Sequence, residues 1–156
     1  MGVSGSGKTT VGRNLADRLG VPYAEADEFH PPANIAKMSA GHPLTDEDRW
    51  PWLRAIADWI REHPDGGVVT CSALKRSYRD LLRTGGPVFF VHLSGVQEVI
   101  AARLAARQGH FMPPALLASQ LADLEPLDAD EPGVVLNVDA TPEALTEAAY
   151  RATQHS

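Results

Sequence analysis

The chain has 156 residues, of which 44% are hydrophobic and 22% are charged, and its net charge at pH 7 is −6. These values fit one globular domain over residues 1–156 and exclude a fibrous or disordered chain. An acidic chain lacks the basic face that sequence-independent binding to DNA or RNA requires, so no nucleic-acid partner is expected. One cysteine and no apolar run of about 20 residues indicate a cytoplasmic protein without a membrane span.

Predicted helices and strands alternate along the chain. Helices are expected at 8–19, 34–40, 46–63, 75–83, 96–107 and 114–124 and from 142 onward, with Gly20 ending the first and Thr45 capping the third. Strands are expected at 21–27, 68–71, 88–93 and 134–138. This alternation predicts an α/β fold with a parallel sheet, helices on both faces, and a site at the carboxyl ends of the strands.

A glycine-rich loop opens the first helix. Gly2-Val3-Ser4-Gly5-Ser6-Gly7-Lys8-Thr9 matches the phosphate-loop pattern G-x-x-x-x-G-K-[ST] at every fixed position. Its backbone N–H groups and the helix N-terminus suit a triphosphate, Lys8 suits the β/γ oxygens, and the Thr9 hydroxyl suits Mg²⁺. The predicted ATP-binding residues are Gly2, Ser4, Gly5, Ser6, Gly7, Lys8, Thr9 and Thr10.

A phosphate loop normally follows a buried strand, yet only Met1 precedes Gly2. Without that strand, two neighbouring strands would lose backbone partners in the middle of the sheet. We therefore expect a strand of about 5–6 residues upstream of Met1.

Asp27 is expected at the end of the strand at 21–27, near the phosphate loop. A carboxylate there could accept the proton of an attacking hydroxyl or help Thr9 hold Mg²⁺. An ordinary strand-end or cap role is the alternative. The strand at 68–71 does not end in Asp, which favours the functional interpretation of Asp27.

Three blocks of the sequence resemble the thermoresistant gluconokinase family. The first block combines Asp27, His30-Pro31, Asn34, Lys37-Met38, Gly41, Pro43-Leu44, Asp46, Asp48-Arg49 and Trp52-Leu53. The second runs from Cys71 to Lys75 and on through Tyr78-Arg79-Asp80 and Leu82-Arg83; the third combines Arg103, Arg107 and His110-Phe111. Ala26 departs from the pattern, which usually has Gly there.

The resemblance implies a nucleoside-monophosphate-kinase-like P-loop fold, with an acceptor segment at about 28–63 and a small lid at about 103–125. It implies phosphorylation of D-gluconate at the 6-hydroxyl by Mg-ATP, and it suggests a homodimer. Catalysis is expected from Lys8, Asp27, Arg103 and Arg107. The implied acceptor-binding residues are Asp27, His30, Asn34, Lys37, Arg49, Lys75, Arg79, Arg83 and His110.

Each of these assignments has a plainer alternative. The lysines and His30 and Asn34 could be ordinary surface residues, and Arg49 could simply pair with Asp46 on its own helix. Arg79 with Arg83, and Arg103 with Arg107, could be solvated helix faces. For the whole chain, the alternatives are a shikimate-kinase-like enzyme and an ATP-binding switch without catalysis.

Overall fold

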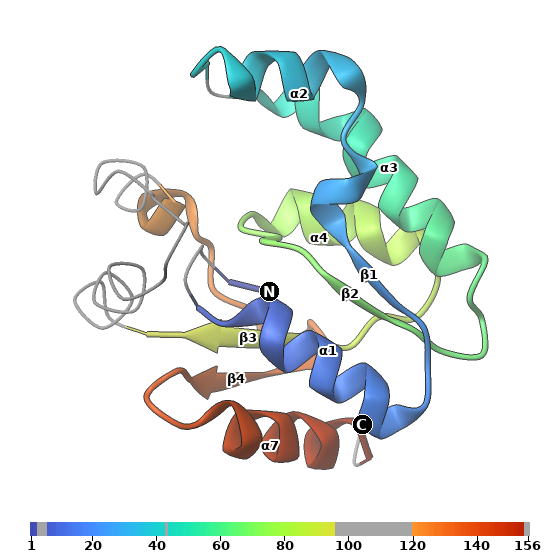
Figure 1. The fold of residues 1–156 in the computed structure, drawn as a ribbon, viewed down its shortest axis with the longest axis vertical. Helices are drawn as coiled ribbons and strands as arrows, with labels where there is room; N and C mark the ends of the chain where they lie inside the picture. Colours follow the sequence, from blue (N-terminus) through green and yellow to red (C-terminus); the bar gives the residue numbers. More distant parts are fainter. Residues whose placement is uncertain (3–5, 43, 96–119, 155–156) are drawn as a thin grey trace.

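The computed structural model describes residues 1–2, 6–42, 44–95 and 120–154 (Figure 1). Its helices are α1 (Lys8–Leu19), α2 (Pro32–Ser39), α3 (Asp46–Arg61), α4 (Arg76–Leu82) and α7 (Pro142–Gln154), with 3₁₀ turns η1 (Ala26–Phe29) and η2 (Arg83–Gly85). Its strands are β1 (Tyr23–Glu25), β2 (Val68–Thr70), β3 (Phe90–Ser94) and β4 (Gly133–Asn137). The predicted alternation is confirmed in these ranges, whereas the predicted helix at 96–107 lies outside them.

The strands form two parallel pairs. β1 pairs with β2, with Tyr23 opposite Val68, and β3 pairs with β4, with Phe90 opposite Gly133. The bounds of all four strands differ from the predicted ones. β1, β2 and β3 are shorter than predicted, and β4 begins and ends one residue earlier. β3, for example, begins at Phe90 although the apolar run begins at Val88, because its pairing with β4 begins only there.

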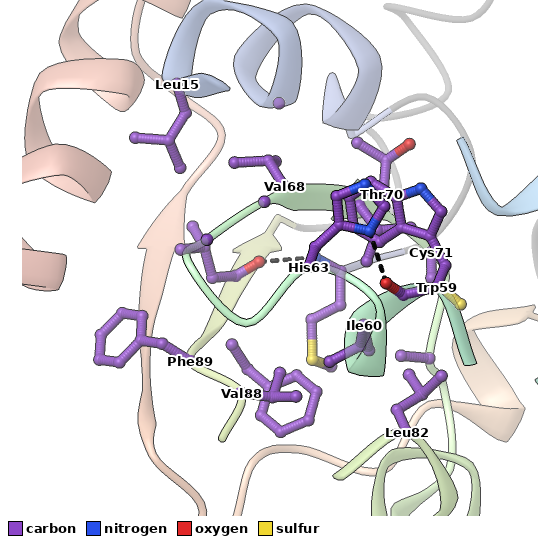
Figure 2. Close-up of a pocket in the computed structure, with 18 of the residues that line it drawn as sticks. Leu15, Trp59, Ile60, His63, Val68, Thr70, Cys71, Leu82, Val88 and Phe89 are labelled. Atoms are coloured by element: carbon purple, nitrogen blue, oxygen red, sulfur yellow. Dashed lines mark hydrogen bonds between the residues drawn. The ribbon is translucent and has the colours of Figure 1, made fainter. Parts of the chain in front are cut away.

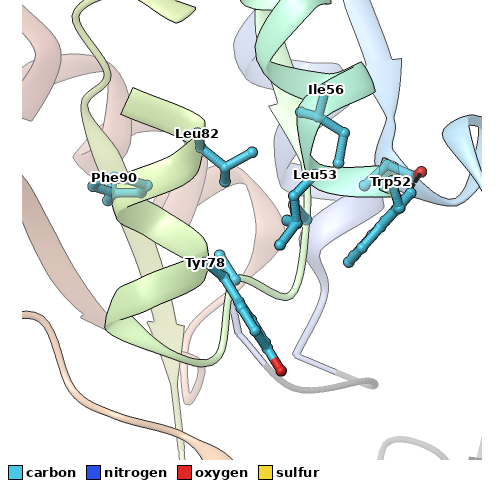
Figure 3. Packing of buried hydrophobic residues seen from close by; sticks show 9 residues of the cluster. Trp52, Leu53, Ile56, Tyr78, Leu82 and Phe90 are labelled. Carbon is cyan, nitrogen blue, oxygen red and sulfur yellow. Dashed lines mark hydrogen bonds between the residues drawn. The ribbon is translucent and has the colours of Figure 1, made fainter. Parts of the chain in front are cut away.

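Helices cover both faces of the strands, as predicted. On one face, Trp52, Leu53 and Ile56 of α3 pack with Tyr78 and Leu82 of α4 (Figure 3). On the other face, Val11 of α1 and Leu145 of α7 pack with Leu93 and Val138. Burial of these side chains supplies the main driving force for folding and fixes the helices against the strands.

Local signals set the helix ends that position the site. Gly20 takes a left-handed conformation (φ 70°) after α1, as predicted. The Thr45 hydroxyl accepts from the Asp48 N–H, and the Asp48 carboxylate accepts from the Thr45 N–H, so a capping box starts α3. The predicted cap is confirmed, and it fixes the first turn of α3.

Met1 and Gly2 lie between the two strand pairs (Figure 1). The Met1 nitrogen donates to the Val91 oxygen at 2.6 Å, and the Leu93 N–H donates to the Met1 oxygen at 2.9 Å. On the other side, the Gly2 N–H donates to the Ser72 oxygen at 3.2 Å. The phosphate loop therefore starts at the carboxyl ends of β2 and β3.

Among the described residues, no helix is both long and apolar enough to cross a membrane.

Candidate active site

The phosphate loop meets α1 at the carboxyl ends of the strands. A Cβ at Gly2 would lie 2.6 Å from the Leu93 oxygen, so only glycine fits between the loop and β3. Gly7 is left-handed (φ 92°) and turns the chain into α1. The Lys8 ammonium donates to the Gly2 oxygen at 2.9 Å, across the mouth of the loop.

The loop offers donors that fit a phosphate group. Lys8, Thr9 and Thr10 form the first turn of α1, whose N–H groups have no intrahelical acceptor. The Ser6 hydroxyl is fully buried and has no hydrogen-bond partner within the described residues, as suits a group that awaits a ligand. Ser4 and Gly5, two further predicted nucleotide-binding residues, lie outside the described residues.

Asp27 is not at the end of a strand, which corrects the sequence-based placement. β1 ends at Glu25, and Asp27 lies on the turn η1 with its side chain exposed. The cause is Trp52, whose indole N–H donates to the Ala26 oxygen at 2.6 Å and holds Ala26 in the core. Asp27 is thereby presented to solvent on the same turn that leads to His30.

His30 connects Asp27 to the helices of the acceptor side. Its ring stacks on Trp52 with centroids 4.4 Å apart, and its Nδ1 lies 3.3 Å from the Asn34 amide nitrogen. Burial lowers the pKa of His30, with the Asp27 charge opposing and the Arg49 charge adding to this shift. A neutral His30 therefore lies within electrostatic reach of both Asp27 and Arg49.

Asn34 and Lys37 fasten α2 to α3. The buried Asn34 amide donates to the Asp48 main-chain oxygen at 2.8 Å, and the Lys37 ammonium donates to the Asp48 carboxylate at 2.7 Å. The Lys37 hydrogen bond is the largest cause that lowers the pKa of Asp48 to about 2. Because Asp48 already neutralises Lys37, this pair offers little net charge to an anion.

Four side chains from α3, from α4 and from the residue before α4 form what we call the acceptor cluster: Asp46, Arg49, Lys75 and Tyr78. The Tyr78 hydroxyl donates to Asp46 and accepts from Arg49 at 2.9 Å. Lys75 and Arg49 lie 3.5 and 3.8 Å from the Asp46 carboxylate. Two cations face one carboxylate, so the cluster keeps one unit of positive charge.

The network also shifts the acid–base properties of the acceptor cluster. The hydrogen bond from Tyr78 and the nearby Lys75 and Arg49 charges lower the pKa of Asp46, which stays ionised. Burial, followed by the Asp46 contact, raises the pKa of Tyr78, which stays protonated as a donor. Asp46 and Tyr78 were not predicted as site residues, although their spacing of three from Arg49 and Lys75 is a helical signal for such contacts.

Arg79 is not available as an acceptor ligand, contrary to the sequence-based assignment. Its side chain is 0% exposed and makes a buried ion pair with Glu131 at 2.7 Å. All five of its N–H donors are used, by both Glu131 oxygens and by the main-chain oxygens of Ala73, Leu74 and Pro126. We call Arg79 and Glu131 the buried clasp.

Arg83 also lies away from the acceptor cluster. It follows α4 at the end opposite Lys75, about 10 Å along the helix axis at 1.5 Å per residue. The alternative that Arg79 and Arg83 form one solvated helix face is also wrong, because Arg79 is buried whereas Arg83 is partly exposed. The predicted lid residues Arg103, Arg107 and His110 lie outside the described residues.

Within the described ranges, no three His, Cys, Asp or Glu side chains gather into a metal site of their own. The predicted Mg²⁺ ligands, Thr9 and Asp27, are both exposed oxygen-bearing side chains. A hydroxyl and a carboxylate suit Mg²⁺, which keeps several waters and takes its remaining oxygens from substrate phosphates.

A phosphate loop at one sheet edge and a separately built acceptor side are the two parts that a P-loop kinase of small molecules requires. That is the class of protein that this fold and site define. The sequence model described as shikimate kinase matches residues 4–127.

Within this class, individual gluconokinases and a sugar kinase are similar to this chain over nearly its whole length. The gluconokinase of Gluconobacter oxydans is 52% identical over 97% of this chain and 87% of its own length. A solved sugar kinase from Janibacter sp. HTCC2649 is 56% identical, with a TM-score of 0.92 over 99% of this chain and 91% of its own. A gluconokinase from Sinorhizobium meliloti is 45% identical, with a TM-score of 0.90 over 99% and 89%. The chain belongs to the gluconokinase family, within the wider shikimate-kinase-like group.

Proposed function

We propose that this chain transfers the γ-phosphoryl group of ATP to the 6-hydroxyl of D-gluconate and releases ADP and 6-phospho-D-gluconate. The acceptor cluster carries the substrate assignment. Arg49 and Lys75 exceed Asp46 by one positive charge, which suits the carboxylate of a sugar acid. The names of the relatives support the same substrate.

The spacing of the acceptor residues suits an extended molecule with a carboxylate at one end. The Asp27 and Arg49 charges shift the pKa of His30 in opposite senses, so both side chains lie close enough to His30 for one acceptor to contact all three. We place the carboxylate at Arg49 and Lys75, the middle hydroxyls at His30 and Asn34, and the 6-hydroxyl at Asp27. Lys37 positions α2 through Asp48 and supports this arrangement indirectly.

Mg-ATP is part of the proposal. When bound, Mg²⁺ would neutralise the triphosphate, with Thr9 and Asp27 as its protein ligands. Lys8 would stabilise the negative charge that develops on the phosphoryl oxygens, and the Ser6 hydroxyl and the first turn of α1 would hold the β-phosphate. Asp27 would orient the 6-hydroxyl and accept its proton.

Arg103, Arg107 and His110 are proposed to close over the phosphates from the 103–125 segment and to exclude water. We further propose a cytoplasmic homodimer, on the resemblance to the family alone.

The test is ADP release with Mg-ATP and four acceptor conditions: D-gluconate, shikimate, AMP and none. Stimulation by gluconate alone is the expected result. Stimulation by shikimate would replace the proposed substrate with that of the wider group. ATP binding without stimulation by any acceptor would instead favour a nucleotide-dependent switch.

A substitution at Asp27 tests its proposed role within the same assay. Asp27→Asn removes the proton acceptor but keeps the size of the side chain, so turnover should fall about 10²–10⁴-fold. ATP affinity, measured by calorimetry, should change little because Lys8 and the loop are intact. Turnover near the wild-type rate would remove Asp27 from the mechanism.

A further inference from the structure

A sugar acid needs polar partners for its carboxylate and its hydroxyls, and two regions of the chain differ in what they offer. An apolar cavity of about 420 Å³ lies between β2 and β3, where Val68, Val88 and Phe89 are among the side chains that line it (Figure 2). Such walls suit hydrocarbon and not hydroxyl groups. The acceptor cluster instead presents three charged side chains that are partly exposed, so the polar end of a sugar acid belongs there.

The two oxygens of the Asp46 carboxylate differ in their contacts. The Tyr78 hydroxyl donates to Oδ1, and the nitrogens of Lys75 and Arg49 lie 3.5 and 3.8 Å from the same atom. Within the part of the chain that the structure describes, Oδ2 makes no hydrogen bond or ion pair. The Asp46 side chain is 44% exposed, so Oδ2 can accept a hydrogen bond from a bound molecule.

Tyr78 holds the Asp46 carboxylate in place. The Tyr78 ring is buried with Leu53 and Leu82, and its hydroxyl points out of that cluster (Figure 3). The hydrogen bond from Tyr78 is the largest cause that lowers the pKa of Asp46, and the Lys75 and Arg49 charges add to it. Asp46 therefore stays an anion at neutral pH and acts only as a hydrogen-bond acceptor.

An anion at this position opposes an anionic substrate unless the substrate also brings a donor. A substrate oxygen about 2.8 Å from the Lys75 nitrogen would lie no more than about 6.5 Å from Asp46 Oδ1. Two carboxylates at that separation repel each other. In a sugar acid, the group nearest to the carboxylate that can donate to Asp46 is the hydroxyl on the neighbouring carbon, the 2-hydroxyl.

We propose that Asp46 accepts a hydrogen bond from the 2-hydroxyl of the acceptor, so that the acceptor cluster selects acids with a hydroxyl next to the carboxylate. This inference rests on the proposed function, because it places the carboxylate at Arg49 and Lys75. The two cations hold the carboxylate, and Asp46 Oδ2 holds the neighbouring hydroxyl. An acid without that hydroxyl leaves Asp46 without a donor beside a second negative charge, which disfavours its binding.

The test measures kcat/KM on three acceptors: D-gluconate, 2-deoxy-D-gluconate and 3-deoxy-D-gluconate. In the wild type, loss of the 2-hydroxyl should lower kcat/KM about 10–100-fold, the range of a hydrogen bond to a charged group. Asp46→Asn keeps the size of the side chain but removes the charge, so this ratio should shrink at least about fivefold. The ratio of gluconate to 3-deoxy-D-gluconate should be equal in the two proteins, because the 3-hydroxyl does not contact Asp46.

Glu47→Gln is the matched control variant. Glu47 is exposed on the same helical turn as Asp46 and makes no hydrogen bond or ion pair among the described residues. Its substitution removes one negative charge from the same end of α3, yet the ratio of gluconate to 2-deoxy-D-gluconate should stay at the wild-type value. Each ratio is internal to one protein, so a loss of folded enzyme on substitution cancels.

Two results would overturn this proposal and leave the proposed function intact. One is an equal fall of kcat/KM on gluconate and 2-deoxy-D-gluconate in Asp46→Asn, which would show that Asp46 only positions Arg49. The other is a wild type that phosphorylates these two acceptors equally well. A wild type that phosphorylates none of the three acids would overturn the proposed function itself, and this proposal with it.

Discussion

The acceptor cluster and the buried clasp use the same chemical group in opposite ways. Arg49 lies on α3 with its side chain 26% exposed, shares Asp46 with Lys75, and keeps donors beyond its one bond to Tyr78. Arg79 lies on α4 at 0% exposure with all five donors used. Only the first can exchange a protein contact for a contact with substrate.

The difference shows why a cationic residue within a family motif is not by itself a ligand. The buried clasp ties α4 to the segment that follows residue 120, through Glu131 and the Pro126 oxygen. It also holds the Ala73 oxygen, and Ala73 has a left-handed backbone (φ 45°) just before Lys75. The clasp therefore supports the loop that presents Lys75, without facing the substrate itself.

The largest effect is expected on removing one half of the buried clasp. Arg79→Met removes the two close Arg79 contacts from the buried Glu131 carboxylate, which keeps only Arg76 at 3.8 Å and the Asp128 N–H, and should cost about 3–5 kcal/mol of unfolding free energy in urea titrations. Arg83→Met is the matched control on the same helix and should cost less than about 0.5 kcal/mol.

A double variant separates the unpaired charge from the lost packing. Arg79→Met with Glu131→Leu should recover part of the loss, because no buried charge remains while the Ala73 and Pro126 oxygens still lack the Arg79 donors. Equal stability of the Arg79→Met and Arg83→Met variants would contradict the role assigned to the clasp.

The pH dependence of stability should report on His92, whose pKa depends on burial and on Arg79 of the buried clasp. His92 on β3 is buried without a hydrogen-bond partner among the described residues, and burial, with the Met1 and Arg79 charges adding to it, lowers its pKa from 6.5 to about 4. Between pH 6.5 and 4, His92 is protonated in the unfolded chain but stays neutral in the folded chain. The free energy of unfolding therefore falls as the pH drops to 4, by about 3 kcal/mol at most.

The measurement is the difference between the wild type and His92→Gln in urea midpoints at pH 7, 6, 5 and 4. The variant lacks the titrating group, so it should lose less stability than the wild type between pH 6.5 and 4. Parallel pH profiles would show that His92 is not buried and neutral in the folded chain.

The smallest effect is expected at Tyr78, within the acceptor cluster. Tyr78→Phe keeps the packed ring but removes the hydroxyl that bridges Asp46 and Arg49. The KM for gluconate should rise about 2–10-fold, because Arg49 stays in place and loses only one of the contacts that orient it, while the KM for ATP stays constant as the internal control. An unchanged KM for gluconate would separate Tyr78 from acceptor binding.

Signals within a few residues were sufficient for part of the structure. The phosphate-loop pattern, the cap at Thr45 and the stop at Gly20 predicted α1 and α3 closely. Strand ends were predicted less well, because a strand is defined by its partner: β3 begins where β4 becomes available. Asp27 was misplaced because Trp52, 25 positions later, holds the main chain at Ala26 and turns it away from β1.

The site residues divide in the same way. Arg49 and Lys75 were assigned to the acceptor only through a family resemblance. The structure brings both to the Asp46 carboxylate, and their roles in binding stay predictions. Nothing near Arg79 in the sequence distinguishes it from Arg49, because its partner Glu131 lies 52 residues away and reaches it only through the fold. The burial of Arg79 could therefore be learned only from the structure.

The most direct measurement compares two acceptors that differ only at the proposed carboxylate position. D-Glucitol carries a hydroxymethyl group where D-gluconate carries its carboxylate. We expect the wild type to favour gluconate over glucitol in kcat/KM, and Arg49→Met to lose about 10–100-fold on gluconate while glucitol stays nearly constant. An equal loss on both acceptors, or no loss on gluconate, would contradict the claim that the acceptor cluster binds the carboxylate.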